Sequence, residues 1–235
     1  MKPLNRRQLL RSGAGLTLLA GLGALDSSAS WAAATSPDIT HGPRSKAEIA
    51  LTFHGAGNPA NAAALLKILR DTKTPVSVFA VGTWLKAEPS LAKQILSDGH
   101  DLGNHTYTHT QMKTISATKV DSEISLCAKE LIALTGTHGS WFRPSGTQYS
   151  TALIRKAAAK YGYKKCISYE VDSHDYQDPG KAAVISNVMK SVKNGSIVSL
   201  HFGHQDTIDA LPTLLDQLRA KGLTPVTLTQ MLGKL

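Results

Sequence analysis

The sequence has few of the residues that build cysteine-based sites. Its 235 residues include only two cysteines, Cys127 and Cys166, and neither belongs to a Cys-x-x-Cys pair. A cysteine-rich zinc site or a thiol redox motif is therefore excluded, and we interpret both thiols as core residues. Charged residues make up 18% of the chain and hydrophobic residues 42%, which is the balance of an ordinary globular protein and not of a disordered or fibrous one.

Three further absences exclude other classes of protein. No stretch after residue 34 approaches the roughly 18 apolar residues of a membrane helix, so we expect no integral membrane segment in the mature chain. The Lys and Arg residues are scattered singly or in pairs such as Lys164-Lys165, so we expect no nucleic-acid partner despite a net charge of +9. No Gly-x-Gly-x-x-Gly motif follows the first predicted strand, which counts against dinucleotide binding.

The first thirty-four residues have the layout of an export signal. A basic stretch (1–13) precedes a Gly-rich apolar stretch (14–25) of about a dozen residues, too short to span a bilayer, and a small-residue stretch (27–34) follows. Arg6-Arg7 followed by Leu9-Leu10 resembles a bacterial twin-arginine signal, and the alternative is an ordinary secretory signal with an accidental arginine pair.

These features predict a simple organisation. We expect a signal peptide at 1–34, a polar linker at 35–46 and one catalytic domain at 47–235. We therefore expect an exported protein, periplasmic or extracellular, whose mature chain begins at Thr35. We also expect it to be a monomer.

The mature chain alternates short apolar runs with amphipathic patterns. Seven runs predict strands, at 48–53, 76–81, 101–105, 140–143, 165–171, 196–202 and 225–228. Between them, apolar spacings of i, i+3, i+4 predict helices at 61–70, 83–97, 117–134, 150–161, 180–192 and 206–221. Such sustained alternation indicates an α/β protein with a parallel sheet. We expect a (β/α) barrel, distorted from the TIM type and with about seven strands, before a doubly wound open sheet.

Reactive side chains follow the predicted strands, where the active sites of such barrels collect. The strand ends carry His54, His105 with His109, Arg143, Asp175 and His201. His105 and His109 are four residues apart, a spacing that places two imidazoles on one face of a helical turn and lets them share a metal. By itself this spacing is a weak signal.

Taken in order, these residues resemble the polysaccharide deacetylases of the NodB-homology type, carbohydrate esterase family 4. The resemblance covers residues 48–232 and rests on four of the family's five motifs. His105-Thr106-Tyr107-Thr108-His109 matches the second motif and Phe142-Arg143-Pro144 the core of the third. Asp172-Ser173-His174-Asp175-Tyr176 matches the fourth, with Tyr for the usual Trp, and Ile197-Val198-Ser199-Leu200-His201 matches the fifth.

The first motif departs from the family. Members read Thr-Phe-Asp-Asp-Gly, with the first Asp as general base and the second as a metal ligand, whereas this chain reads Thr52-Phe53-His54-Gly55. Three interpretations follow: His54 completes a three-histidine metal site, His54 is the general base, or the site no longer hydrolyses its ligand. Phe202 also replaces the Asp that usually follows the fifth-motif histidine.

The resemblance implies a function. It implies a metal-dependent hydrolase that removes acetyl groups, from an amide or an O-acetyl ester, on a cell-envelope or extracellular polysaccharide. His105 and His109 would hold a divalent metal, with zinc the expected ion. His201 would be the general acid, oriented by Asp175. In the family Arg143 orients the Asp base; because that Asp is absent here, we expect Arg143 to contact Asp172 or the substrate, and a guanidinium next to His54 would keep that imidazole neutral. The alternative is a deacetylase-fold protein that binds acetylated glycan without hydrolysing it.

Overall fold

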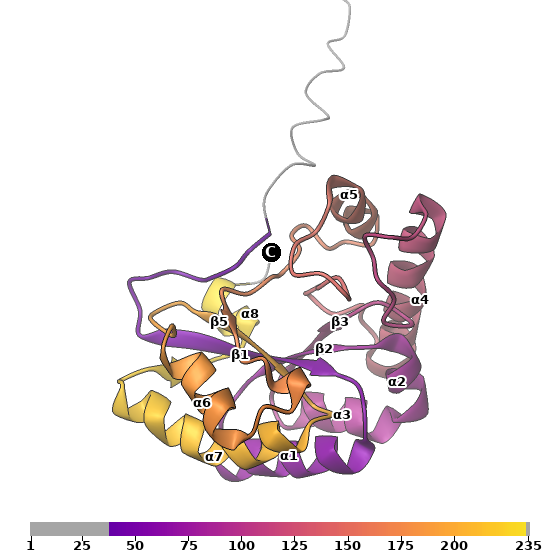
Figure 1. Ribbon diagram of the computed structural model, residues 1–235. Coiled ribbons are helices and arrows are strands. Elements are labelled where there is room, and N and C mark those ends of the chain that lie inside the picture. The colour runs from indigo at the N-terminus through magenta and orange to yellow at the C-terminus, as the bar shows by residue number, and fades with distance from the viewer. Residues whose placement is uncertain (1–37, 234–235) are drawn as a thin grey trace, which may run out of the picture.

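The computed structural model describes residues 38–233, which form an α/β barrel (Figure 1). The expected signal peptide lies outside the described residues. Six parallel strands have the bounds β1 Glu48–Gly55, β2 Ser77–Ala80, β3 Asp101–Asn104, β4 Val171–Asp172, β5 Ile197–His201 and β6 Thr224–Pro225. In the sheet they follow the order β3-β2-β1-β5-β4, and the short β6 pairs with the start of β1.

The barrel closes through single bridges instead of a seventh full strand. Phe142, in the run expected as the fourth strand, forms parallel bridges to Asn104 of β3 and to Cys166. The chain from Cys166 continues into β4, which pairs with β5. The predicted barrel is therefore confirmed, with the fourth strand reduced to one bridging residue.

The N-terminal end of the described chain helps to close this wall. Ile39 forms a parallel bridge to Ile167, and His41 an antiparallel bridge to Ser196. Arg44 extends the contact through a two-pronged ion pair with Glu170. Part of the segment expected as a linker thus lies along the barrel.

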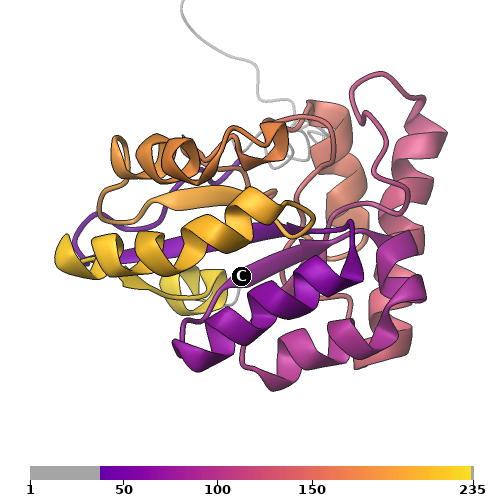
Figure 2. The ribbon, with the colours of Figure 1, turned by 60° about the horizontal axis from the view of Figure 1, so that its bottom comes forward.

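The helices form the outer layer. Their bounds are α1 Pro59–Asp71, α2 Gly82–Ala87, α3 Pro89–Ser97, α4 Ala117–Thr135, α5 Ala152–Lys160, α6 Lys181–Met189, α7 Gln205–Ala220 and α8 Leu228–Leu232. Helices α1, α3 and α7 lie together on one side of the strands in both ribbon views (Figures 1 and 2). The single helix expected at 83–97 is two, because Pro89 cannot donate a backbone hydrogen bond and begins a new helix.

The side chains of β1 alternate between two cores. Leu51 and Phe53 pack in the large cluster that joins the strands to the helices, whereas Ala50 belongs to an inner cluster with Phe79 and Trp141. Thr52 and His54 lie on the same side of the strand as Ala50, because neighbouring side chains of a strand point to opposite faces. The barrel therefore presents His54 to its interior at the carboxyl end of β1.

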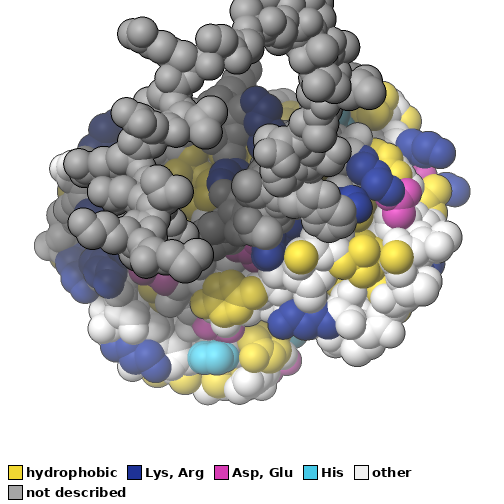
Figure 3. All heavy atoms as spheres, turned by 90° about the horizontal axis from the view of Figure 1, so that it is seen from above, with side chains coloured by type: hydrophobic (Ala, Val, Ile, Leu, Met, Phe, Trp, Pro, Cys, Tyr) yellow, Lys and Arg dark blue, Asp and Glu magenta, His cyan; other side chains and the backbone are white. Residues whose placement is uncertain are grey.

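Two further features concern membrane-spanning helices and the distribution of charge. None of the helices in the described part of the chain is both long and apolar enough to cross a membrane. On the described part of the face in Figure 3, Lys and Arg side chains lie in separate groups with hydrophobic and acidic side chains between them.

Candidate active site

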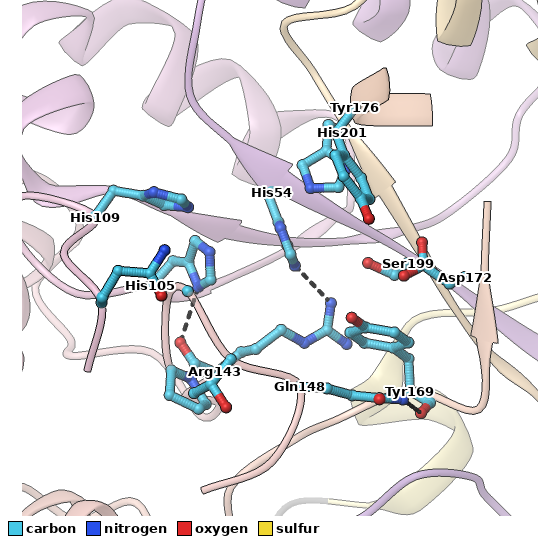
Figure 4. Close-up of a pocket in the computed structure, with 14 residues that line it drawn as sticks. His54, His105, His109, Arg143, Gln148, Tyr169, Asp172, Tyr176, Ser199 and His201 are labelled. Carbon is cyan, nitrogen blue, oxygen red and sulfur yellow. Dashed lines mark hydrogen bonds between the residues drawn. The ribbon is translucent and has the colours of Figure 1, made fainter. Parts of the chain in front are cut away.

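The predicted site residues come together at the carboxyl ends of the strands. A cavity of about 430 Å³ is lined by His54, His105, His109, Arg143 and His201 (Figure 4). Asp175 contacts the Nδ1 atom of His201. The ring of His54 lies between two others, with centroids 4.3 Å from His105 and 4.4 Å from His201. All six residues chosen from the sequence therefore belong to one site.

Arg143 is a buried cation without a carboxylate partner. Its side chain donates to the carbonyls of Ile167 and Ser168, and its Nη1 atom donates to Thr52 Oγ1 at 2.9 Å and contacts His54 Nε2 at 3.2 Å. Its guanidinium also lies 4.4 Å from the ring centroid of Phe79. Burial lowers the pKa of this side chain to about 9. Among the described residues, none of the ion pairs involves Arg143.

The contact with Arg143 fixes the protonation of His54. Arginine can only donate, so His54 Nε2 accepts, and the proton of the neutral ring lies on Nδ1. Burial, together with His105, His201 and the Arg143 charge, holds the pKa of His54 well below its usual value. His54 is therefore a neutral imidazole whose one lone pair is engaged by Arg143.

His105 is also protonated on Nδ1, but its lone pair is free. Its Nδ1 donates to the backbone carbonyl of Arg143 at 2.8 Å, since a carbonyl can only accept. The lone pair is then on Nε2, which is buried and makes no hydrogen bond. Burial lowers the pKa of this ring well below 6.5. A histidine held by a backbone carbonyl on one nitrogen and free on the other is the usual arrangement of a metal ligand.

His109 reaches the site from a loop and not from a helix. Thr106 and His109 both have left-handed backbone conformations, with φ of 69° and 57°, so the expected helical turn at 105–109 is wrong. Asn104 Oδ1 accepts from the Thr106 amide and turns the chain away from a helix. The two rings still meet, with centroids 5.0 Å apart.

His201 and Asp175 form a tight pair. His201 Nδ1 lies 2.6 Å from Asp175 Oδ1, and the backbone amide of His201 and the Thr207 hydroxyl both donate to Oδ2. Burial raises the pKa of Asp175, but these hydrogen bonds lower it more, so the pKa is below its usual value. The carboxylate thus holds the proton of His201 on Nδ1 and leaves Nε2 for the cavity.

The metal-ligand position at Gly55 has no ligand side chain. Among the described residues, no three His, Cys, Asp or Glu side chains are arranged as ligands around one point. A side chain at Gly55, where the family has its third ligand, would begin 2.9 Å from Val78 Cγ1. Both cysteines are buried and unpaired, as expected. The site therefore offers two histidine ligands, with β2 crowding the position of the usual third.

Sequence reasoning missed several residues of the cavity. Gln111, Gln148 and Tyr169 line it, although no motif included them, and so does Ser199, a fifth-motif residue to which no role was assigned. Their side chains reach the cavity through loop and strand positions that carry no spacing signal. His204 lines a neighbouring cavity of about 350 Å³ and pairs with Asp178 at 2.9 Å. The side chain of His174 is about half-exposed and lines neither cavity.

Comparison with known proteins shows which family this chain resembles. The family model described as polysaccharide deacetylase matches residues 41–166. A peptidoglycan-N-acetylglucosamine deacetylase of Bacillus cereus is 32% identical over 194 residues, which cover 81% of this chain and 90% of that protein. The chain belongs to the polysaccharide deacetylase family. Members of this family are hydrolases that act on carbon–nitrogen bonds other than peptide bonds.

Solved structures share the fold and include altered members. The structure of a carbohydrate esterase family 4 pseudoenzyme from Bacillus anthracis has a TM-score of 0.76 and 26% identity, covering 82% of this chain and 68% of that one. A mutant of that pseudoenzyme with restored enzymatic activity has a TM-score of 0.77 and 28% identity, covering 82% and 70%. Loss of activity on this fold therefore has a structural precedent.

The neutral histidines predict a pH dependence of stability. Because His54 and His105 have lowered pKa values when folded, the unfolded chain binds more protons near pH 6, so the free energy of unfolding falls as pH decreases through about 6.5. Each ring contributes up to about 1.4 kcal/mol per pH unit below that value. Urea denaturation of metal-free protein between pH 7.5 and 5.5 should show this slope, and His105→Gln should reduce it. A stability that stays flat over this range contradicts the neutral cluster.

Proposed function

We propose that this protein is a metal-dependent deacetylase that hydrolyses N-acetyl groups, or O-acetyl esters, of a cell-envelope or extracellular polysaccharide. The relative from Bacillus cereus is named for peptidoglycan N-acetylglucosamine, which makes peptidoglycan the first substrate to test. The observation that carries the proposal is the His201–Asp175 pair, which faces the two-histidine loop across one cavity. Zinc is the ion that we expect.

The donor set supports a metal at His105 and His109. The buried Nε2 atom of His105 has a lone pair and no partner, and the ring of His109 is its neighbour. A divalent ion bound there would polarise the acetyl carbonyl and lower the pKa of a bound water. Two histidines leave positions open for substrate and water, and they are one protein ligand fewer than a catalytic zinc site usually has.

The His201–Asp175 pair supplies the proton transfer. Hydrolysis adds water to the carbonyl carbon, breaks the bond to nitrogen and leaves acetate and an amine, and the departing nitrogen must gain a proton. His201 Nε2 is the group placed to give it, since Asp175 fixes the other nitrogen. A positioned general acid of this kind contributes on the order of 10²–10⁴ in rate.

His54 occupies the position of the general base, but it offers fewer acceptor sites than a carboxylate. A carboxylate can accept from Arg143 through one oxygen and use the other on water, but a neutral imidazole has a single lone pair. In the structure Arg143 engages that lone pair. His54 therefore acts as a base only when its contact with Arg143 opens, and we propose that water activation is slow.

The same contact favours a second candidate function. In this chain Arg143 engages the base at position 54, and Gly55 stands where the family has its third metal ligand. A protein of this kind would bind acetylated glycan without hydrolysing it. The pseudoenzyme of the same fold supports this alternative. We place either activity outside the cytoplasm, on the evidence of the signal-like sequence at 1–34.

The first test is acetate release from peptidoglycan and from chitin oligosaccharides, with the purified mature protein supplied with zinc. We expect release by the wild type, and a loss of about 10²- to 10⁴-fold in His201→Gln because the leaving nitrogen is no longer protonated. His174→Gln, at an exposed position outside the cavity, is the control and should keep full activity. Wild-type protein that pulls down with the polymer but releases no acetate would establish the binding function instead.

The base position predicts the outcome of a second variant. His54→Asp restores a carboxylate that can accept from Arg143 and still present an oxygen to water, so we expect faster acetate release than in the wild type. His54→Asn, which has one acceptor oxygen, is the matched control and should bring no gain. A slower His54→Asp enzyme would show that the imidazole itself is the working base.

A further inference from the structure

The loop that presents His109 is held by a buried carboxylate from a neighbouring helix. Glu123, on α4, is fully buried, and its Oε2 atom accepts from the backbone amides of Tyr107 at 2.9 Å and Thr108 at 2.7 Å. Its Oε1 atom accepts from the Thr108 hydroxyl at 2.7 Å and pairs with Lys119 at 2.9 Å. Two consecutive amides of the histidine loop therefore depend on one side chain.

The loop needs this support because its backbone is strained. Left-handed conformations at residues other than glycine are strained and persist only where surrounding contacts impose them. Thr106 and His109 are two such residues, and they lie on either side of the amides that Glu123 holds. The α2 end adds the complementary contacts, with Gly82 and Thr83 donating to the carbonyls of Thr106 and Tyr107.

The two histidines do not depend on the loop equally. The ring of His105 is fixed by its own hydrogen bond to the Arg143 carbonyl. His109 has no such bond to another residue in the described structure, and its exposed side chain follows wherever the loop places it. Loss of the Glu123 contacts should therefore displace His109 first.

We infer that Glu123 is a positioning residue for the metal site, which acts by holding Tyr107 and Thr108 so that His109 faces His105. The inference rests on the proposed role of these two histidines as metal ligands. No spacing rule pointed to Glu123, because it lies fourteen positions after His109 on another element. Burial raises its pKa, but the hydrogen bonds from Thr108 and Lys119 lower it more, so the side chain is a carboxylate.

The test compares cobalt binding by Glu123→Ala, Glu123→Gln and the wild type, using Co²⁺ alone as the probe. We expect Glu123→Ala to weaken Co²⁺ binding by about 10- to 100-fold, the usual effect of losing a residue that orients a ligand, and to change the visible absorption spectrum. Glu123→Gln should restore both, since one amide oxygen can still accept from both backbone amides. Lys119→Met removes only the exposed partner and should bind as the wild type does.

A stability control separates positioning from general weakening. Val120→Ala removes buried volume from the same helix, in a cluster that contains neither Tyr107 nor Thr108, so it should lower the melting temperature and leave Co²⁺ affinity unchanged. Equal loss of affinity in Val120→Ala and Glu123→Ala, or wild-type affinity in Glu123→Ala, would overturn the inference.

Hydrogen exchange tests the inference without a metal. In the metal-free protein, the Tyr107 and Thr108 amides should exchange faster in Glu123→Ala than in Lys119→Met. If the wild type binds no Co²⁺, the metal-dependent function fails, and the role of Glu123 in holding the loop is then judged by this exchange. Unchanged protection in Glu123→Ala would refute it.

Discussion

The buried guanidinium of Arg143 is the constraint on which the rest of the site depends. It follows the bridge residue Phe142, donates to carbonyls of the segment that closes the barrel, and reaches Thr52 and His54 of β1. Its own carbonyl holds His105. The same residue thus links closure of the barrel to the protonation of two site histidines. A buried cation normally requires an anionic partner, and here neutral acceptors and two aromatic rings replace one.

This constraint explains how the chain accommodates its altered first motif. With a carboxylate at position 54, Arg143 would have a counter-ion; with His54 it has an uncharged acceptor, and the ring must stay neutral. The substitution preserves the hydrogen bond and removes the charge pair. What changes is the number of free lone pairs beside the cavity, and we propose that this number decides between hydrolysis of the glycan and binding alone.

The order of strands and helices and the gathering of the six candidate residues around one cavity could be predicted from the sequence, because apolar periodicity and strand-end positions carry that information. The conformation of the histidine loop could not, because it depends on Asn104, five positions before His109, and on Glu123, fourteen positions after it, and no periodicity encodes their contacts. The fourth strand was predicted too long, since the bridges at Phe142 are set by neighbouring chain segments. That Arg143 contacts His54, with no hydrogen bond to Asp172 among the described residues, was likewise visible only in three dimensions.

Arg143 engages the lone pair of His54, whereas the Nε2 atom of His105 makes no hydrogen bond. Ring ¹⁵N chemical shifts at pH 7, recorded before and after addition of zinc, measure this difference directly. We expect neutral rings protonated on Nδ1 for both residues, with zinc shifting Nε2 of His105 and leaving Nε2 of His54 in place. A zinc-induced shift of His54 Nε2, or an unaffected His105, would contradict this expectation.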